Sequence, residues 1–266
     1  MTIEGLAALL RAAGCVFAED EAELLLDAAV GPALEDLVDR RVAGEPLEHL
    51  LGWVEFAGRR WSVGPGVFVP RRRTELMVRT ALETLPDAGL EHRRQTVLLD
   101  LCCGCGAIGG AVLAALPQHN AVLHASDIVP AAVEHARRNL EPLGGVVHQG
   151  DLFAPLPSDL HGRVDLLLCN APYVPRAAIA TMPPEARDHE PAVALDGGGD
   201  GLDVLRRVVG GAPSWLKQGG SLLFEVGDDQ VVAATSMVSG AGLRPRVVRD
   251  HDEDGPGGIV VVATAG

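Results

Sequence analysis

The sequence is poor in aromatic residues and lacks long hydrophobic runs. Phe, Trp and Tyr make up 3% of its 266 residues, with a single tyrosine among them. No apolar run reaches the roughly 18 residues that a membrane-spanning helix needs, and the first residues do not follow the pattern of a signal peptide. We therefore expect a cytoplasmic protein without a membrane partner.

Positive charge is also scarce. The 22 lysines and arginines face 36 aspartates and glutamates, which leaves a formal net charge of −14. This balance argues against a partner bound through its phosphate backbone, so we expect no direct contact with nucleic acid. The acidic character suits a protein partner that is basic or presents a glutamine, although solubility explains it equally well.

The few cysteines do not have the spacing of a zinc site. Cys102, Cys103 and Cys105 share one turn, Cys169 follows much later, and Cys15 lies near the N-terminus. No Cys-x-x-Cys pair is matched by a second pair, so a metal site explains the pattern less well than buried thiols in a reducing compartment. We predict that the protein binds no metal.

What the sequence does contain is a polar turn directly after a short apolar run. Residues 164–169 have the length and composition of a buried parallel strand, and Asn170 follows it. Open α/β sheets bind ligands at the carboxyl ends of their strands. The Asn170 side-chain oxygen and the Ala171 carbonyl are two acceptors that suit a planar NH₂ group, such as a glutamine amide or the exocyclic amine of a base. A plain loop, in which the asparagine caps its own backbone, is the alternative.

A glycine-containing turn earlier in the chain predicts a cofactor that carries a ribose. It follows an apolar strand at 97–101, and Gly104 and Gly106 allow a ligand to approach the main chain closely. Asp127 ends the next predicted strand, where it can accept hydrogen bonds from ribose hydroxyls. Because the turn and Gly109 also satisfy the dinucleotide fingerprint, a nicotinamide-dependent oxidoreductase stays open at this point.

Together the two turns resemble known motifs. Asp100-Leu-Cys-Cys-Gly-Cys-Gly106 resembles motif I of class I S-adenosylmethionine-dependent methyltransferases. Asn170-Ala-Pro-Tyr173 resembles the Asn-Pro-Pro-Tyr motif of those that methylate planar amide or amine nitrogens. Two more segments, Gly44-Glu-Pro-Leu-Glu-His-Leu-Leu-Gly52 and Val67-Phe-Val-Pro-Arg-Arg-Arg-Thr-Glu75, are similar to the protein-(glutamine-N5) methyltransferases that modify peptide chain release factors. The resemblance implies S-adenosyl-L-methionine as cofactor and a release factor as protein substrate.

Later segments at 190–202 and 219–227 are also similar to that family. Two positions depart from its motifs. Cys102 replaces the first glycine of the turn, and Ala171 replaces the first proline. Residue 171 is needed for its backbone carbonyl, so alanine should preserve its role with some loss of rigidity. The helical segment before the Gly-Glu-Pro motif is shorter than in the family, so the reaction carries over to this chain more directly than the substrate.

The resemblance also implies roles for individual residues. The amino-acid end of the cofactor would lie over the glycine turn with Asp100 near its ammonium, and the ribose would lie at Asp127. The ring of Tyr173 would either pack or stabilise the cationic methylsulfonium. The expected catalytic residues are Asn170, Ala171, Pro172 and Tyr173. The expected cofactor-binding residues are Asp100, Cys102, Cys103, Gly104, Cys105, Gly106, Asp127, Asp151, Leu152, Asn170, Phe68 and Thr74.

The periodicity predicts an α/β fold with a doubly wound sheet, which the resemblance identifies as the Rossmann-like sheet of class I methyltransferases. Residues 1–50 are expected to form a helical N-terminal substrate-recognition module, residues 51–72 a β-hairpin linker, and residues 73–266 the methyltransferase domain. The predicted strands of that domain are 97–101, 121–126, 146–148, 164–169 and 221–226, with an antiparallel pair at 244–249 and 259–263. The predicted helices are 73–85, 107–116, 130–140, 202–210 and 230–239.

Three other functions stay open. An amine methyltransferase acting on an adenine base or a small molecule would use the same Asn170 turn. A nicotinamide-dependent oxidoreductase would leave that turn unexplained. A protein that binds S-adenosylmethionine without catalysis is compatible with the departures at Cys102 and Ala171.

Overall fold

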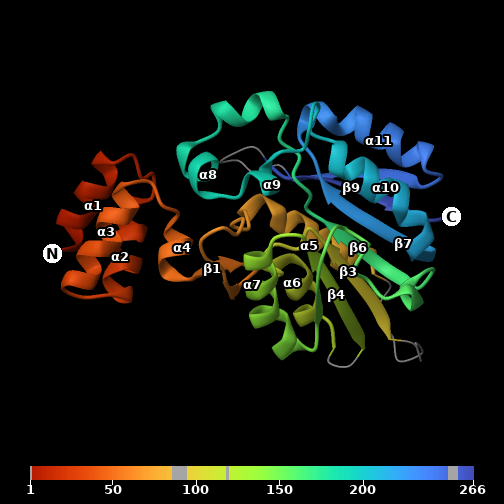
Figure 1. The fold of residues 1–266 in the computed structure, drawn as a ribbon, viewed down its shortest axis with the longest axis horizontal. Helices are drawn as coiled ribbons and strands as arrows, with labels where there is room; N and C mark the ends of the chain where they lie inside the picture. The colour runs from red at the N-terminus through yellow and green to blue at the C-terminus, as the bar shows by residue number, and fades with distance from the viewer. Residues whose placement is uncertain (1, 86–94, 118–119, 251–256) are drawn as a thin grey trace.

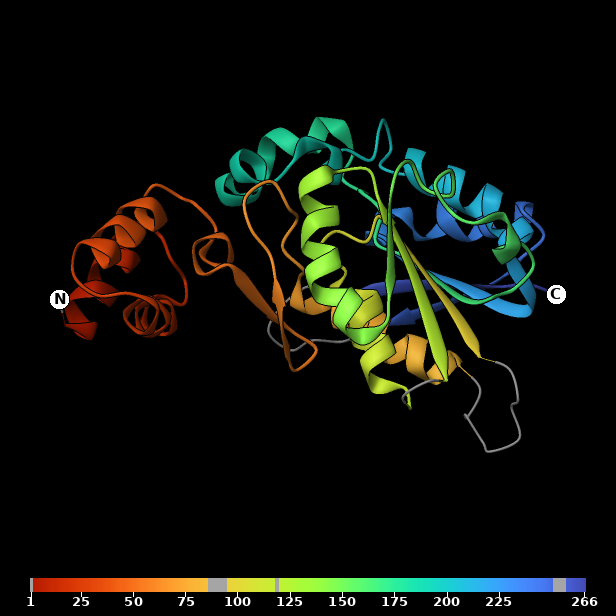
Figure 2. The ribbon, with the colours of Figure 1, turned by 60° about the horizontal axis from the view of Figure 1, so that its bottom comes forward.

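The computed structural model describes residues 2–85, 95–117, 120–250 and 257–266. Within these ranges a seven-stranded sheet has the order β5-β4-β3-β6-β7-β9-β8 (Figures 1 and 2). Its first five strands are parallel neighbours, and β9 and β8 are added antiparallel at one edge. This confirms the predicted doubly wound sheet and its closing pair. The strands are β3 (Thr96–Leu101), β4 (Ala121–Asp127), β5 (Val146–Gln149), β6 (Val164–Cys169), β7 (Leu216–Glu225), β8 (Arg244–Arg249) and β9 (Ile259–Thr264).

Helices cover both faces of the sheet because successive strand residues point to opposite sides. Leu98 of β3 belongs to the core under α5, α6 and α7, whereas Leu99 belongs to the core under α10 and α11. Both faces are thus buried, which explains why the central strands are apolar at almost every position. The helices are α5 (Glu75–Thr84), α6 (Ala107–Ala115), α7 (Pro130–Leu140), α10 (Asp203–Trp215) and α11 (Val231–Gly240).

The N-terminal helices form a separate group at one end of the molecule (Figure 1). Their apolar side chains, such as Leu6, Leu10 and Leu25, pack into a cluster of their own. None of the helices in the described ranges is both long and apolar enough to cross a membrane. The group consists of α1 (Ile3–Ala12), α2 (Ala18–Ala28), α3 (Pro32–Val42) and the short α4 (Leu47–Leu51).

A two-stranded hairpin, β1 (Trp53–Phe56) and β2 (Arg59–Ser62), follows this group, as the sequence predicted. Ala57 and Gly58 both have positive φ, 49° and 70°, which is the geometry of a two-residue type I′ turn. Trp61 of the hairpin packs where a side chain on Gly110 of α6 would stand, so the helix can approach the hairpin closely.

The structure extends two predicted elements and adds several that the sequence did not predict. Helix α10 continues past Gly210 and Gly211 to Trp215, because Ala212 and Trp215 prolong its buried face. Strand β7 begins at Leu216 rather than at residue 221. The segment between β6 and α10, expected as a loop, contains η4 (Arg176–Thr181), α8 (Pro184–His189) and α9 (Ala192–Leu195). Single 3₁₀ turns are η1 (Arg72–Thr74), η2 (Glu141–Leu143), η3 (Ser158–Leu160) and η5 (Asp228–Gln230).

Candidate active site

A cavity of about 280 Å³ opens at the carboxyl ends of the parallel strands. Its walls include the turn after β3, the end of β4 and the turn after β6. The chain leaves β3 toward β4 and β5 and then returns to β6 on the other side of β3. The cavity therefore lies at the topological switch point, where open α/β sheets bind ligands.

Hydrogen bonds to the end of β4 fix the turn after β3. The Cys103 amide donates to the Ser126 carbonyl at 3.1 Å, and the Gly104 amide donates to Oδ2 of Asp127 at 2.8 Å. Cys102 and Gly104 have φ values of 53° and 55°, so the backbone doubles back here. A side chain on Gly104 would meet no atom within 4 Å, which leaves open space for a ligand against the main chain.

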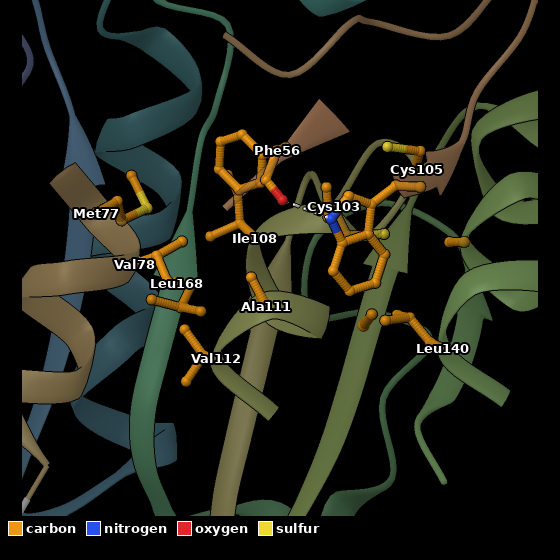
Figure 3. Close-up of a cluster of buried hydrophobic side chains, with 14 of the residues drawn as sticks. Phe56, Met77, Val78, Cys103, Cys105, Ile108, Ala111, Val112, Leu140 and Leu168 are labelled. Carbon is orange, nitrogen blue, oxygen red and sulfur yellow. Dashed lines mark hydrogen bonds between the residues drawn. The ribbon is translucent and has the colours of Figure 1, made fainter. Parts of the chain in front are cut away.

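The thiols of Cys103 and Cys105 lie in the hydrophobic core beneath this turn. Figure 3 shows both among Ile108, Leu140 and other apolar side chains. Burial raises the pKa of Cys103 well above its ordinary value and the pKa of Cys105 to about 12. These thiols are therefore protonated packing groups. Among the described residues, no group of three or more His, Cys, Asp or Glu side chains is arranged to hold a metal ion.

Asp127 contributes an oriented carboxylate to the cavity wall. Its Oδ1 accepts a hydrogen bond from the Val129 amide at 2.9 Å, opposite the Gly104 bond on Oδ2. Burial raises the pKa of Asp127, and hydrogen bonds from the Val129, Gly104 and Ile128 amides oppose that effect. Each oxygen keeps a further lone pair, so the carboxylate can still accept hydrogen bonds from a diol. The predicted ribose-binding role fits this geometry.

Three of the predicted cofactor residues lie behind the cavity wall rather than in it. Asp100 is fully buried under the turn, where its Oδ2 accepts a hydrogen bond from the Gly109 amide at 2.9 Å. Burial raises the pKa of this carboxyl to about 7. Gly106 leads the chain into α6 with φ of 79°, and Thr74 is buried against Glu225. The resemblance implied that these three residues contact the cofactor, but the sequence could not show which residues line the cavity and which lie behind its wall.

The turn after β6 places an unused acceptor in the cavity wall. Oδ1 of Asn170 is buried and has no hydrogen-bond partner in the part of the chain that the structure describes. Ala171, which is 2% exposed, and Pro172 continue the wall. A buried acceptor without a partner costs roughly 1–3 kcal/mol. This oxygen is thus suited to a ligand that brings its own N–H donor.

Tyr173 ends the turn and is held by a network that the sequence did not reveal. Its hydroxyl donates to Oε1 of Glu225 at 2.7 Å and accepts from Nη2 of Arg73 at 2.8 Å. Burial raises the pKa of Tyr173, and the neighbouring Glu225 carboxylate raises it further. Glu225 and Arg73 were missed because they lie 52 and 100 residues from the tyrosine in the chain.

The remaining walls come from the linker, the turn after β5 and the segment around α9. Phe68 lines one side, with the Arg71 guanidinium 5.0 Å from its ring centre. Asp151 and Leu152 line another, and Asp151 is paired with Arg207 at 2.6 Å. Nine of the twelve predicted cofactor residues thus lie in the wall; they are Phe68, Cys102, Cys103, Gly104, Cys105, Asp127, Asp151, Leu152 and Asn170.

Comparison with known proteins gives the class of this fold and site. Residues 64–186 match the model of the methyltransferase small domain. The fold is similar to that of a methyltransferase from Pyrococcus furiosus, with a TM-score of 0.55 at 16% identity over 77% of this chain and 88% of that one. The molecule is a class I, Rossmann-like methyltransferase, and S-adenosylmethionine is its cofactor.

Relatives define the family more closely. A release factor glutamine methyltransferase of Geobacter sulfurreducens is 39% identical over 79% of this chain and 71% of its own length. One of Mycolicibacterium smegmatis is 36% identical over 95% and 93%. A 4-amino-L-phenylalanine/4-methylamino-L-phenylalanine methyltransferase of Streptomyces pristinaespiralis is 32% identical over 88% and 79%. The chain belongs to the family of the release factor glutamine methyltransferases.

Proposed function

We propose that this protein transfers a methyl group from S-adenosylmethionine to the side-chain amide nitrogen of a glutamine in a peptide chain release factor. The observation that carries the proposal is the buried Asn170 oxygen, which has no partner among the described residues and lies in the cavity wall that Ala171 continues. A primary amide has two N–H donors in one plane, so two neighbouring acceptors match it. The family membership supports the same substrate chemistry.

The two acceptors orient the amide for attack. Oδ1 of Asn170 and the carbonyl of Ala171 each accept one amide hydrogen, which holds the nitrogen with its face toward the methyl donor. The same hydrogen bonds shift electron density onto a nitrogen that is otherwise a poor nucleophile, because its lone pair is delocalised. The bound cofactor supplies a methyl group on a positively charged sulfur. Positioning and electrostatic complementarity then provide most of the rate enhancement.

As the nitrogen–methyl bond forms, the methyl–sulfur bond would break and leave the demethylated thioether as product. No strong base is required if the proton leaves the nitrogen only after this transfer, because the methylated and still protonated amide is acidic enough to release it to solvent water. This fits the wall on the amide side, which offers neutral acceptors at Asn170 and Ala171. The phenol of Tyr173 is engaged with Glu225 and Arg73. We assign it no proton-transfer role; its ring either completes the wall or lies beside the cationic sulfur.

On the cofactor side, we assign the amino-acid end to the turn of residues 102–106 and the ribose to Asp127. Asp151 and Leu152 would hold the adenine, and Phe68 would cover it. Open space at Gly104 and the free lone pairs of Asp127 support these assignments. Asp100 would support the turn of residues 102–106 from beneath, through its hydrogen bond with the Gly109 amide.

The release factor would reach the cavity with help from the N-terminal helices, which we propose as the substrate-recognition module. Their hydrophobic core is separate from the cores of the sheet. The cavity wall includes no residue before Gly66, so the module can serve recognition without touching the cofactor. The net charge of −14 favours a protein partner over nucleic acid. We place the reaction in the cytoplasm, alongside translation.

One incubation tests the proposal. The purified protein is mixed with S-adenosylmethionine and a release factor, and the digest is analysed by mass spectrometry for a methyl group on a glutamine amide. A parallel sample contains 4-amino-L-phenylalanine, because one relative carries that name. Methylation of the glutamine supports the proposal. Methylation of the aromatic amine alone would replace it with a small-molecule amine methyltransferase.

A further inference from the structure

Glu225 is a buried carboxylate at the same sheet edge as the polar turn. It ends β7, is 2% exposed, and follows Phe224, which pairs with Cys169 of β6. Asn170 comes directly after Cys169 in the chain. The glutamate side chain therefore lies beside the turn that presents the two acceptors.

Three side chains donate hydrogen bonds to this one carboxylate. Oε1 accepts from the Tyr173 hydroxyl at 2.7 Å and from Nε of Arg73 at 3.1 Å. Oε2 accepts from the Thr74 hydroxyl at 2.6 Å. Because Nη2 of Arg73 also donates to the Tyr173 hydroxyl at 2.8 Å, the glutamate, the arginine and the tyrosine form a closed ring.

The backbone of Tyr173 is anchored independently. Its carbonyl accepts a hydrogen bond from Nε2 of Gln230 at 2.8 Å, and the same nitrogen donates to the Asp200 carbonyl at 2.9 Å. A side chain on Gly201 would come within 2.2 Å of the Tyr173 carbonyl oxygen, so the neighbouring loop packs directly against it. The phenol ring thus attaches Tyr173 in addition to its backbone.

The ion pair joins the buried Glu225 carboxylate to Arg73, whose side chain is 42% exposed, so charge pairing alone adds little to stability. Its advantage is directional, because the carboxylate accepts hydrogen bonds only along defined lines. We propose that Glu225 is a positioning residue for methyl transfer: by fixing the Tyr173 phenol it holds the turn so that Oδ1 of Asn170 and the Ala171 carbonyl converge on one amide. This inference rests on the proposed function.

The test compares Glu225→Gln, Tyr173→Phe and the double variant with wild type on a release factor. We expect each single change to lower kcat about tenfold, with KM and cofactor Kd changed less than about twofold, because remote contacts supply the binding. We expect the double variant to be no slower than Tyr173→Phe, since Glu225→Gln weakens and Tyr173→Phe removes the same charge-assisted hydrogen bond. Glu75→Gln is the matched control, because Glu75 accepts a bond from the Ala57 amide away from the cavity.

A spectroscopic measurement on Tyr173 distinguishes a loss of positioning of its ring from a general loss of structure. Tyr173 is the only tyrosine of the chain, so a protein labelled with 3-fluorotyrosine gives one ¹⁹F resonance from this ring. We expect Glu225→Gln to move that resonance toward the free amino acid, while Glu75→Gln leaves it in place. Should Glu225→Gln fold poorly, Tyr173→Phe removes the hydrogen bond that Glu225→Gln weakens, and it keeps the carboxylate with Arg73 and Thr74.

Unchanged kcat in both single variants would overturn the inference. So would a double variant whose loss is the product of the two single losses. An unshifted ¹⁹F resonance in Glu225→Gln would do the same. Failure of wild type itself to methylate glutamine would instead refute the proposed function, so the two failures are distinguishable.

Discussion

Cys102 shows how a single residue can depart from a family motif and keep its geometry. The family has glycine at this position, and Cys102 adopts φ of 53°, in the left-handed region that glycine occupies without strain. In this conformation a cysteine is sterically strained by about 1–2 kcal/mol. Packing of its side chain against the core on the α10 face offsets part of that strain.

Substitutions of Cys102 test whether its backbone is strained and whether the turn keeps its geometry. We expect Cys102→Gly to change the free energy of unfolding by no more than about 1 kcal/mol, because relief of strain offsets lost packing. We expect Cys102→Val to cost about 2 kcal/mol, because a β-branched residue is especially unfavourable at positive φ. Denaturant unfolding and calorimetry with the cofactor measure both effects. Weaker cofactor binding in Cys102→Gly than in wild type would contradict this account.

Asp100 makes stability depend on pH. Burial raises its pKa from 3.8 to about 7, so the folded protein keeps a proton that the unfolded chain loses between these values. The contribution of this group to the free energy of unfolding is full below pH 3.8 and is lost as the pH rises through about 7. We expect Asp100→Asn to flatten this part of the stability profile, measured by urea unfolding across the range. An unchanged slope in Asp100→Asn would contradict this explanation.

The sequence could predict the site residues that directly follow strands. Asn170 and Asp127 both stand where an apolar run ends, and strand ends meet at one edge of a parallel sheet. Glu225 also stands at a strand end, but its contact with Arg73 could not be found in this way, because 152 residues separate them and the contact depends on tertiary packing. The same limit applies to Asp100, whose place beneath the turn depends on how closely α6 approaches β3.

At the scale of elements, strongly patterned segments were predictable and helix ends were not. The hairpin was predicted because its strands alternate around Ala57-Gly58. Helix α10 was predicted to end at its glycine pair, but tertiary burial of Trp215 carries it further. The short α8 and α9 lie in a proline-rich stretch whose hydrogen bonds depend on neighbours, such as the Val174 amide that donates to the Leu195 carbonyl at 3.2 Å.

The N-terminal module gives a prediction at this scale. Removal of residues 1–46 keeps α4, whose buried His49 hydrogen-bonds the Val67 carbonyl at 2.9 Å next to the cavity wall. We expect cofactor Kd to change less than about twofold and kcat/KM for the release factor to fall by at least about 100-fold, since only recognition is lost. Calorimetry and initial rates measure the two quantities. A truncated protein that folds and methylates at full rate would show that the module has no role in substrate recognition.

At the scale of the whole molecule, the strands bring residues from distant parts of the chain to one edge. Asp127, the glycine turn, the Asn170 turn and Glu225 come from four consecutive strands of the sheet, β4, β3, β6 and β7 respectively. Helices on both faces bury the strands and hold their ends in register (Figure 2). The topology thus gathers these residues at one edge of the sheet, and we propose that substrate specificity depends on the turn after β6.

The central claim is that Asn170 accepts a hydrogen bond from the amide being methylated. The most direct measurement is the rate of glutamine methylation by Asn170→Ala, with Ala171→Pro as the matched control in the same turn. We predict that Asn170→Ala lowers kcat by about 10²–10³ with cofactor Kd nearly unchanged, and that Ala171→Pro, which keeps the carbonyl, stays active. An Asn170→Ala variant that methylates a verified glutamine substrate at the wild-type rate would contradict the account.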